Sequence, residues 1–400
     1  MNSSRRAGAR ALILPAAAAA AAVAATTAIV AAGIATVSAI LAREVVTPPG
    51  PDAPDTQVLG INEIEGTIVL SRTDFTVLPG QYGIWYGRPE RLVRIGEVVA
   101  VGEHTVTREL PAQNLRGLVG HGGGRFTAWV DADPTTVAEH WENVHIPVDN
   151  GVAPAWLFPV EDENAPWLVV VHGRGTRQGE GLRAVPTAQA AGYNVLLLSY
   201  RNDGDAPASA DGRYGLGLTE WHDVDAALGW VRARSAARIV LMGWSMGGAI
   251  SLQTVLNGEH GSEVSALLLD SPVIDWAEVL AFQARERRLP RPVRDIAVHL
   301  LGAGWASGIT GLGEPVRLDR MNLVARADEL RIPTLILHSV DDDVVPAEAS
   351  QALAIERPDI VTLEEFGVAR HTKLWNFDRE RWERLVHDWL DAQREPSTQD

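Results

Sequence analysis

The feature that most constrains this chain is a serine in a glycine-rich turn directly after a run of apolar residues. The run covers residues 238–242, and the turn at Gly243–Gly248 reads GWSMGG. A buried strand that enters a G-x-S-x-G turn and continues into a helix is typical of a nucleophile elbow. Glycines on both sides of the serine let the strand and the helix pass close together. The turn therefore predicts a nucleophilic serine, Ser245.

Two further groups that such a serine needs follow it in the sequence. A strand-like run at 334–338 leads into three consecutive aspartates, Asp341–Asp343, and His371 follows a second strand-like run at 360–363. A serine hydroxyl is a poor nucleophile unless an adjacent base accepts its proton during the attack. A carboxylate then holds the imidazole in the required tautomer and stabilises the imidazolium that forms. We expect His371 to be the base.

The chain order serine, aspartate, histidine and a second glycine-rich turn extend this pattern. The turn is His172–Gly175, with the sequence HGRG, and it follows the apolar run 167–171. In these features the chain resembles the α/β-hydrolase superfamily over roughly residues 141–390. The branch to which it is most similar holds serine-aminopeptidase-like and prolyl-oligopeptidase-like hydrolases and many bacterial esterases.

The resemblance implies roles for individual residues. That branch carries its acid four residues after a histidine, in the pattern H-G-x-x-D-x-x-V-P, and this selects Asp342. It also implies that the backbone N–H groups of Met246 and Arg174 bind the developing oxyanion. Each such donor typically contributes about 10²–10³ in rate. The expected catalytic set is Ser245, Asp342 and His371.

Other residues compete for the acid and base positions. They are Asp341 and Asp343 for the acid, and His338, His299 and His387 for the base. The aspartate run could also be a solvated turn or a site for a hard metal ion. A calcium-type cage requires further carboxylates at regular spacing, and none follow here. The sequence therefore predicts no metal.

A second glycine-rich sequence matches an oxyanion motif of lipases letter for letter. It reads HGGG at His121–Gly124. No strongly apolar strand precedes it, and the helix expected after such a motif is missing. We therefore interpret His121–Gly124 as a flexible turn.

An insertion at about 271–329 is too long for a simple connection between strands. In the superfamily that the chain resembles, an insertion at this place forms a cap over the pocket. Its aromatic residues, together with the one before the serine, are the expected substrate contacts: Trp276, Phe282, Trp305 and Trp244. It also carries a basic cluster: Arg285, Arg287, Arg288, Arg291 and Arg294. The cluster either attracts an anionic substrate group or forms a solvated helix face.

Composition excludes several classes of function. The formal net charge is −16, and no basic stripe exists that would neutralise phosphates, so we expect no nucleic-acid partner. The chain has no cysteine, which excludes disulfides, thiol catalysis and thiolate metal sites. Neither a Rossmann nor a P-loop glycine pattern is present. We expect no cofactor, and a small molecule or a peptide as substrate.

The N-terminal region predicts a membrane segment. Arg5, Arg6 and Arg10 precede an uncharged stretch from Ala11 to Ala42. This stretch is longer than the ~20 residues that span a bilayer as a helix. Basic residues before it favour a cytoplasmic N-terminus, which places the remaining chain outside the cytoplasm. The alternative is a secretory signal cleaved near Val37–Ala39, which would release the protein.

The pattern along the chain predicts four parts. Residues 1–44 form the signal anchor or signal peptide, residues 45–57 a linker, and residues 58–140 a small β-rich domain. Residues 141–396 alternate strand-like and helix-like segments, which is typical of an α/β fold with a mostly parallel central sheet. The cap insertion lies within this last domain.

These features predict a serine hydrolase that cleaves an ester, or an amide, through an acyl-enzyme. A peptidase of the prolyl oligopeptidase or serine aminopeptidase type is one alternative. The other is a non-catalytic scaffold at the cell surface, whose expected signature is the loss of a catalytic residue. The oligomeric state is open.

Overall fold

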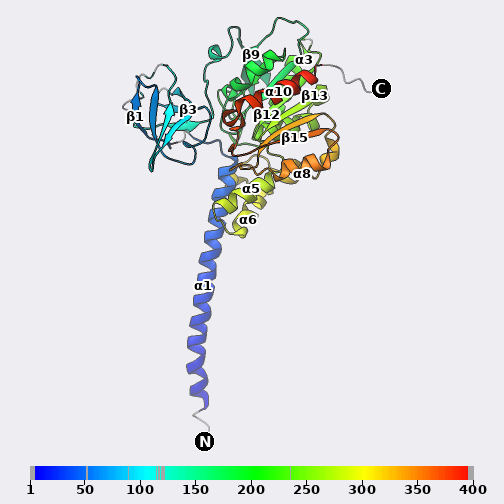
Figure 1. Ribbon diagram of the computed structural model, residues 1–400. Helices are drawn as coiled ribbons and strands as arrows, with labels where there is room; N and C mark the ends of the chain where they lie inside the picture. Colours follow the sequence, from blue (N-terminus) through cyan, green and yellow to red (C-terminus); the bar gives the residue numbers. More distant parts are fainter. Residues whose placement is uncertain are drawn as a thin grey trace.

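A computed structural model describes residues 5–50, 53–88, 90–113, 115, 118, 122–234 and 236–394, with backbone only for residues 5–24. It has three parts: a long N-terminal helix, a small β-rich region, and a larger body of strands and helices (Figure 1). His121, the first residue of the second HGGG-type sequence, lies outside the described residues.

An eight-stranded mixed sheet forms the centre of the body, in the order β15-β14-β13-β12-β10-β11-β9-β8. Strands β10 to β15 pair in parallel, whereas β8 and β9 form an antiparallel hairpin that joins the sheet at β11. The strands are β8 (Glu142–Val148), β9 (Gly151–Phe158), β10 (Trp167–Val171), β11 (Asn194–Leu198), β12 (Ile239–Trp244), β13 (Val264–Asp270), β14 (Thr334–Ser339) and β15 (Val361–Phe366). The expected α/β fold with a mostly parallel sheet is confirmed.

Helices cover both faces of this sheet because its strands are apolar on both sides. In β12, Ile239 and Leu241 face one core, and Val240 and Met242 face the other. Three helices pack on the first face: α3 (Trp221–Arg232), α4 (Met246–Asn257) and α8 (Glu348–Glu356). Two helices pack on the second face, α2 (Val185–Ala190) and α10 (Arg379–Ala392), and the short α9 (Leu374–Phe377) precedes α10. The sheet is therefore buried from both sides.

The segment between β13 and β14 contains three helices of its own. They are α5 (Trp276–Glu286), α6 (Arg291–Gly302) and α7 (Ser307–Thr310), with the 3-10 turn η4 (Gly304–Ala306) before α7. Their buried side chains join the same core as α3 and α4. Together they form the insertion that the sequence predicts, which we call the cap.

The β-rich region contains two small antiparallel sheets around a core of its own. The first has the order β1-β2-β6-β5, and the second has the order β4-β3-β7. Their strands are β1 (Val58–Asn62), β2 (Thr67–Ser71), β3 (Tyr82–Tyr86), β4 (Arg91–Ile95), β5 (Val98–Val101), β6 (Thr105–Glu109) and β7 (Arg125–Thr127). All seven strands lie within residues 58–140, for which the sequence predicts a small β-rich domain.

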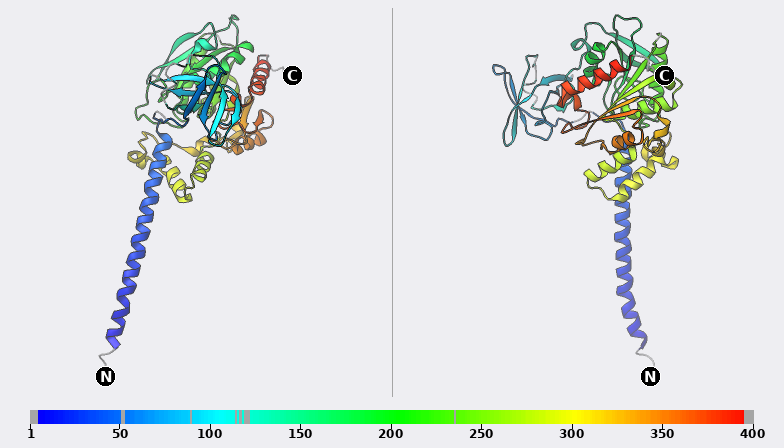
Figure 2. Two further views of the ribbon diagram at one scale, coloured as in Figure 1. Left: turned by 60° about the vertical axis from the view of Figure 1, so that its left-hand side comes forward. Right: turned by 45° about the vertical axis from the view of Figure 1, so that its right-hand side comes forward.

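The N-terminal helix α1 runs from Arg5 to Val46 and extends away from the rest of the molecule (Figures 1 and 2). Its part from Ala25 to Val46 is, within the described residues, the one segment long and apolar enough to cross a membrane, with a mean hydropathy of 1.9. The final turns lie beside the cap, and Leu41, Ala42 and Val46 are buried in the main core. The helix thus ends inside the body.

Candidate active site

Ser245 lies between the end of β12 and the start of α4, in a backbone conformation that few side chains adopt. Its φ is 52° and its ψ is −118°. Such strain persists where the surrounding structure enforces it, and it is concentrated at functional sites. The neighbouring residues must be glycine because a side chain there would clash with the backbone. A Cβ at Gly243 would lie 2.4 Å from the Gly247 carbonyl oxygen, and one at Gly247 would lie 2.2 Å from that of Val171.

Three side chains that the sequence singles out meet at this turn. His371, in the loop after β15, has its Nε2 2.9 Å from Ser245 Oγ. Its Nδ1 lies 2.7 Å from Oδ2 of Asp342, in the loop after β14. Because β12, β14 and β15 are parallel, their carboxyl ends lie at one edge of the sheet. Residues that are up to 126 positions apart in the chain are thereby brought into hydrogen-bond contact.

The Asp342 carboxylate is fixed by hydrogen bonds on both oxygens. Its Oδ1 accepts from the backbone N–H groups of Val344 (2.9 Å) and Val345 (2.8 Å). Burial raises the pKa of Asp342, but the charge of His371 and the hydrogen bonds of His338 and His371 outweigh that effect. The pKa of Asp342 therefore lies well below its usual value. A carboxylate held ionised next to an imidazole favours the imidazolium.

The competing residues lie differently. Asp343 accepts from the backbone N–H of His371 at 3.2 Å, not from its ring. His338 is buried behind Asp342, with its Nε2 3.0 Å from the Val345 carbonyl oxygen and 3.4 Å from Asp342 Oδ2. His299 packs near Trp305 in the cap, and His387 lies beside Asp388 on α10. Among the described residues, no group of three or more histidines and carboxylates is arranged to hold a metal ion.

The two residues expected to bind the oxyanion are Met246, directly after Ser245, and Arg174, which lines the pocket beside Ser245. Met246 is the first residue of α4, where a helical N–H has no partner within the helix. In the loop after β10, the N–H of Gly173 donates to Glu180 Oε2 (2.7 Å) and that of Gly175 donates to Asp203 Oδ2 (3.2 Å). Between them, the N–H of Arg174 has no hydrogen-bond partner in the part of the chain that the structure describes.

A pocket of about 250 Å³ opens onto Ser245 and His371. Its lining is largely apolar and comes from α1, the cap and the loop after β14. The lining residues are Leu41, Glu44, Val45, Arg174, Ser245, Val273, Trp276, Val279, Leu280, Gln283, Arg287, Val344, Val345 and His371. The space next to the serine therefore suits an apolar group.

The four aromatic residues expected to touch substrate divide into two groups. Trp276 lines the pocket, and its Nε1 donates to the Leu216 carbonyl oxygen at 2.7 Å. Trp244 is fully buried under the guanidinium of Arg183, because its side chain points into the core below the turn. Phe282 and Trp305 lie on the cap away from the lining, and Trp305 is 69% exposed. The structure therefore separates these three side chains from the pocket.

Sequence reasoning missed the contribution of α1. Leu41, Glu44 and Val45 line the pocket, although the sequence pattern around them indicates only a membrane segment and the start of a linker. The first charged pair after the uncharged stretch, Arg43 and Glu44, is the one signal that the helix leaves an apolar environment there.

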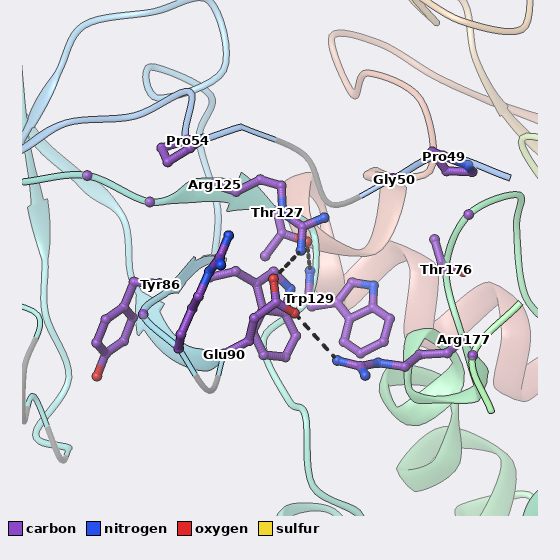
Figure 3. A pocket seen from close by; sticks show the side chains of 17 residues that line it. Pro49, Gly50, Pro54, Tyr86, Glu90, Arg125, Thr127, Trp129, Thr176 and Arg177 are labelled. Carbon is purple, nitrogen blue, oxygen red and sulfur yellow. Dashed lines mark hydrogen bonds and ion pairs between the residues drawn. The ribbon is translucent and has the colours of Figure 1, made fainter. Parts of the chain in front are cut away.

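A larger cavity of about 1020 Å³ lies between the β-rich region and the body (Figure 3). Arg177 lies 5.7 Å from the ring centres of both Trp85 and Trp129, and Glu90 forms ion pairs with Arg177 and Arg125. Ser245 and His371 do not line this cavity. The candidate chemistry therefore stays with the smaller pocket, which Ser245 and His371 line.

Comparison with known proteins identifies the family of the body. Residues 168–387 match the alpha/beta hydrolase family, and residues 57–127 match a domain of unknown function (DUF8805). The lysophosphatidylserine lipase ABHD12 of Rattus norvegicus is 26% identical over 219 residues, which are 53% of this chain and 49% of the relative. The protein YqkD of Bacillus subtilis is 24% identical, over 56% of this chain and 70% of that protein.

Solved structures give the same fold. An esterase of Pyrococcus furiosus superposes with a TM-score of 0.51 at 17% identity, over 66% of this chain and 94% of that chain. The chain spans about half the length of the ABHD12 relatives that it matches. The residues that match the hydrolase family include strands β11 to β15 of the central sheet and most of β10, and the β-rich region lies outside them.

Proposed function

Because the chain belongs to the α/β-hydrolase family, we propose that it is a serine hydrolase that cleaves carboxylic esters through an acyl-enzyme on Ser245. The observation that carries the proposal is the continuous hydrogen-bonded series from Ser245 Oγ through His371 to Asp342, at 2.9 and 2.7 Å. A non-catalytic scaffold has no need to keep all three groups at these distances beside an open pocket.

In the proposed reaction, Ser245 Oγ attacks the ester carbonyl carbon while His371 Nε2 accepts the hydroxyl proton. The carbonyl oxygen becomes an oxyanion, and the N–H groups of Met246 and Arg174 donate hydrogen bonds to it. His371 then gives its proton to the leaving alcohol as the ester C–O bond breaks. Water attacks the acyl-enzyme by the same route, which releases the acid and restores Ser245.

The pocket supports an acyl ester rather than a peptide. Its apolar side chains include Val273, Val279 and Leu280, which suit a hydrocarbon chain. Two of its charged groups, Glu44 and Arg287, form an ion pair with each other at 3.0 Å, and the guanidinium of Arg174 donates to the carbonyl oxygens of Glu44 and Thr47. A peptidase that recognises a free amine or carboxylate requires an unpaired countercharge, and this pair does not supply one. Because relatives include lysophosphatidylserine lipases, we propose a lipid ester as the substrate.

The experiment compares the full-length protein with Ser245→Ala and, as a matched control, Ser251→Ala. Ser251 is a buried serine in α4 whose Oγ donates to the Gly247 carbonyl oxygen at 2.7 Å. Each protein is treated with a fluorophosphonate probe and assayed with p-nitrophenyl esters and aminoacyl p-nitroanilides. We expect Ser245→Ala to lose labelling and about 10⁶ in kcat, and Ser251→Ala to keep both.

Two outcomes contradict the proposal. Labelling that persists in Ser245→Ala would place the nucleophile elsewhere, and a folded wild type that neither labels nor turns over would favour the scaffold. Faster cleavage of the anilides than of the esters would favour the peptidase.

We also propose that α1 anchors the protein with its catalytic body outside the cytoplasm. The apolar part from Ala25 to Val46 and the arginines before it support this topology. The chain has no cysteine, so a single introduced cysteine is its only thiol, and labelling of that thiol reports on which side of the membrane the residue lies. A membrane-impermeant maleimide on intact cells should label Ile64→Cys, where the side chain is 99% exposed, and should not label Ala7→Cys. The opposite pattern would invert the topology, and labelled protein in the medium would indicate a cleaved signal.

A further inference from the structure

The last turns of α1 are built into the body, although the same helix is the candidate membrane span. Ser38, Leu41, Ala42 and Val46 are buried on one side of the helix. The end of the helix is held by the body, because the N–H of Tyr214 donates to the Val46 carbonyl oxygen at 2.9 Å. A helix end fixed in this way is a structural part of the domain and not a tether.

The same turns lie beside the catalytic serine. Leu41, Glu44 and Val45 line the 250 Å³ pocket with Ser245 and His371. Across the pocket are Trp276, Val279 and Leu280 of α5. A ligand at Ser245 therefore lies between an anchor helix and a cap helix, and both present apolar side chains to it.

The opposite side of α1 is apolar and uncovered. Ile29 is 72% exposed, Val30 55% and Ile40 60%. The body covers only one side of this helix, although the helix is apolar on all sides. Its other side therefore requires a further apolar environment. Because Ile40 and Leu41 are neighbours in sequence, the lipid-facing side and the pocket-facing side belong to the same turn.

The cap carries a matching exposed surface next to α1. Its apolar members are Ile296 on α6, Trp305 in η4 and Ile309 on α7, which are 36%, 69% and 38% exposed. The Ile309 carbonyl oxygen accepts from Arg43 Nη1 at 3.1 Å, which fixes this surface beside the helix. Tryptophan with arginine nearby is typical of the membrane–water interface, and Arg291 and Arg294 are on α6. Figures 1 and 2 place α6 beside the helix where it leaves the body.

We propose that the end of α1 is one wall of an acyl-binding pocket, and that the substrate is a single-chain lipid that reaches Ser245 from the bilayer alongside α1. A volume of about 250 Å³ is below the ~300–1,000 Å³ of sites that enclose drug-sized ligands, which favours one acyl chain over two. The inference rests on the proposed function, because the ester carbonyl must lie at Ser245.

The first test asks whether a change at Leu41 affects the reaction of a long-chain probe more than that of a short-chain probe. A change that acts on Ser245 itself would affect both probes equally. Full-length protein in nanodiscs reacts with an ethyl and with a dodecyl fluorophosphonate, and the ratio of the long-chain to the short-chain labelling rate is measured. Leu41→Trp fills the pocket, and we expect the ratio to fall at least about tenfold. Leu41→Ala enlarges the pocket and should raise the ratio. The matched control is Ile40→Trp, on the exposed side of the same turn, which should leave both rates unchanged.

The outcomes distinguish this inference from the proposed function. If the wild type labels with neither probe, the proposed function fails. Two results with a wild type that labels would contradict the proposal that α1 forms a wall of the acyl pocket. One is that Leu41→Trp slows both probes equally, and the other is that Ile40→Trp lowers the ratio as Leu41→Trp does. If Leu41→Trp does not fold, the ratio for Leu41→Ala decides the question alone.

The second test concerns the route and the number of chains. Vesicles of an inert ether lipid contain either a monoacyl glycerolipid or its diacyl counterpart as substrate. The total substrate concentration is held constant while added ether lipid lowers the fraction of substrate in the vesicle surface. We expect hydrolysis of the monoacyl lipid only, at a rate that follows its surface fraction. A rate that follows the bulk concentration would overturn access from the bilayer, and equal hydrolysis of the diacyl lipid would overturn the single-chain pocket.

Discussion

The guanidinium of Arg174 donates hydrogen bonds to the carbonyl oxygens of Glu44 (2.9 Å) and Thr47 (2.7 Å) at the end of α1. The last carbonyls of a helix lack partners within it and carry its negative dipole end, which a cation stabilises. The backbone N–H of the same arginine is a proposed oxyanion donor. One residue thus connects the end of α1 with the loop that carries a proposed oxyanion donor.

Arg174→Ala should therefore lower kcat more than it raises KM. Without its guanidinium contacts the loop is less well fixed, and a small displacement of an aligned group can cost about 10²-fold in rate. Arg174→Lys restores a cation near the helix end and should recover part of kcat. Initial rates over a range of short-chain ester concentrations measure this split.

Arg43→Ala is the matched control for that change. Arg43 lies near the end of α1 and donates to the Ile309 carbonyl oxygen of α7, but it does not line the pocket. We expect its kcat to stay within a few-fold of wild type. An equal loss of kcat in both variants would mean that general loosening of α1, and not the oxyanion loop, is responsible.

Asp342→Asn tests which of the three consecutive aspartates serves the base. Asp342 Oδ2 contacts His371 Nδ1, and an asparagine there favours the wrong imidazole tautomer, which can lower kcat by about 10⁴. Asp343 receives only the backbone N–H of His371, and Asp341 has no contact with the His371 ring. Asp341→Asn and Asp343→Asn should each lose much less. Comparable losses in all three would point to the turn as a whole.

The low pKa of Asp342 also predicts how stability depends on pH. A carboxyl whose pKa is lower in the folded than in the unfolded state stabilises the fold above its unfolded pKa, about 3.9. That contribution is lost as the pH falls through the folded value. Urea unfolding of wild type and Asp342→Asn should therefore differ most near neutral pH, and the difference should shrink below about pH 4. A difference that is constant with pH would contradict the ionised carboxylate.

Much of the site follows from local sequence rules. The strand before Gly243, the glycines around Ser245 and the apolar strands before Asp342 and His371 each fix a local conformation. Parallel strands then bring their carboxyl ends together. This part of the arrangement can be predicted because each step depends on neighbours in the sequence or on a general property of parallel sheets.

The remainder depends on contacts between distant segments, which no local pattern encodes. Leu41 has the same surroundings in sequence as Ile40, yet one lines the pocket and the other is exposed. Trp305 is apolar like Trp276, but a turn in the cap directs it outward. Tertiary packing decides these cases.

Lys373, two residues after His371, is the only lysine of the chain. Its Nζ donates to the His371 carbonyl oxygen at 3.2 Å and lies 5.3 Å from the ring centre of Phe75, in the β-rich region. Burial lowers the pKa of Lys373, and the carboxylates of Asp343 and Asp342 offset part of that effect. The neutral amine, which is the reactive form, should therefore appear at a lower pH than in an unfolded chain.

Competitive acetylation followed by peptide mass mapping measures this pKa without interference, because the α-amine is the one other primary amine. We expect a midpoint below the ~10.4 of an unperturbed lysine, and a return to that value in denaturant. Asp343→Asn removes a negative neighbour that favours the ammonium, so the midpoint should fall further. A native midpoint at or above the denatured value would mean that the neighbouring carboxylates outweigh the burial of the amine.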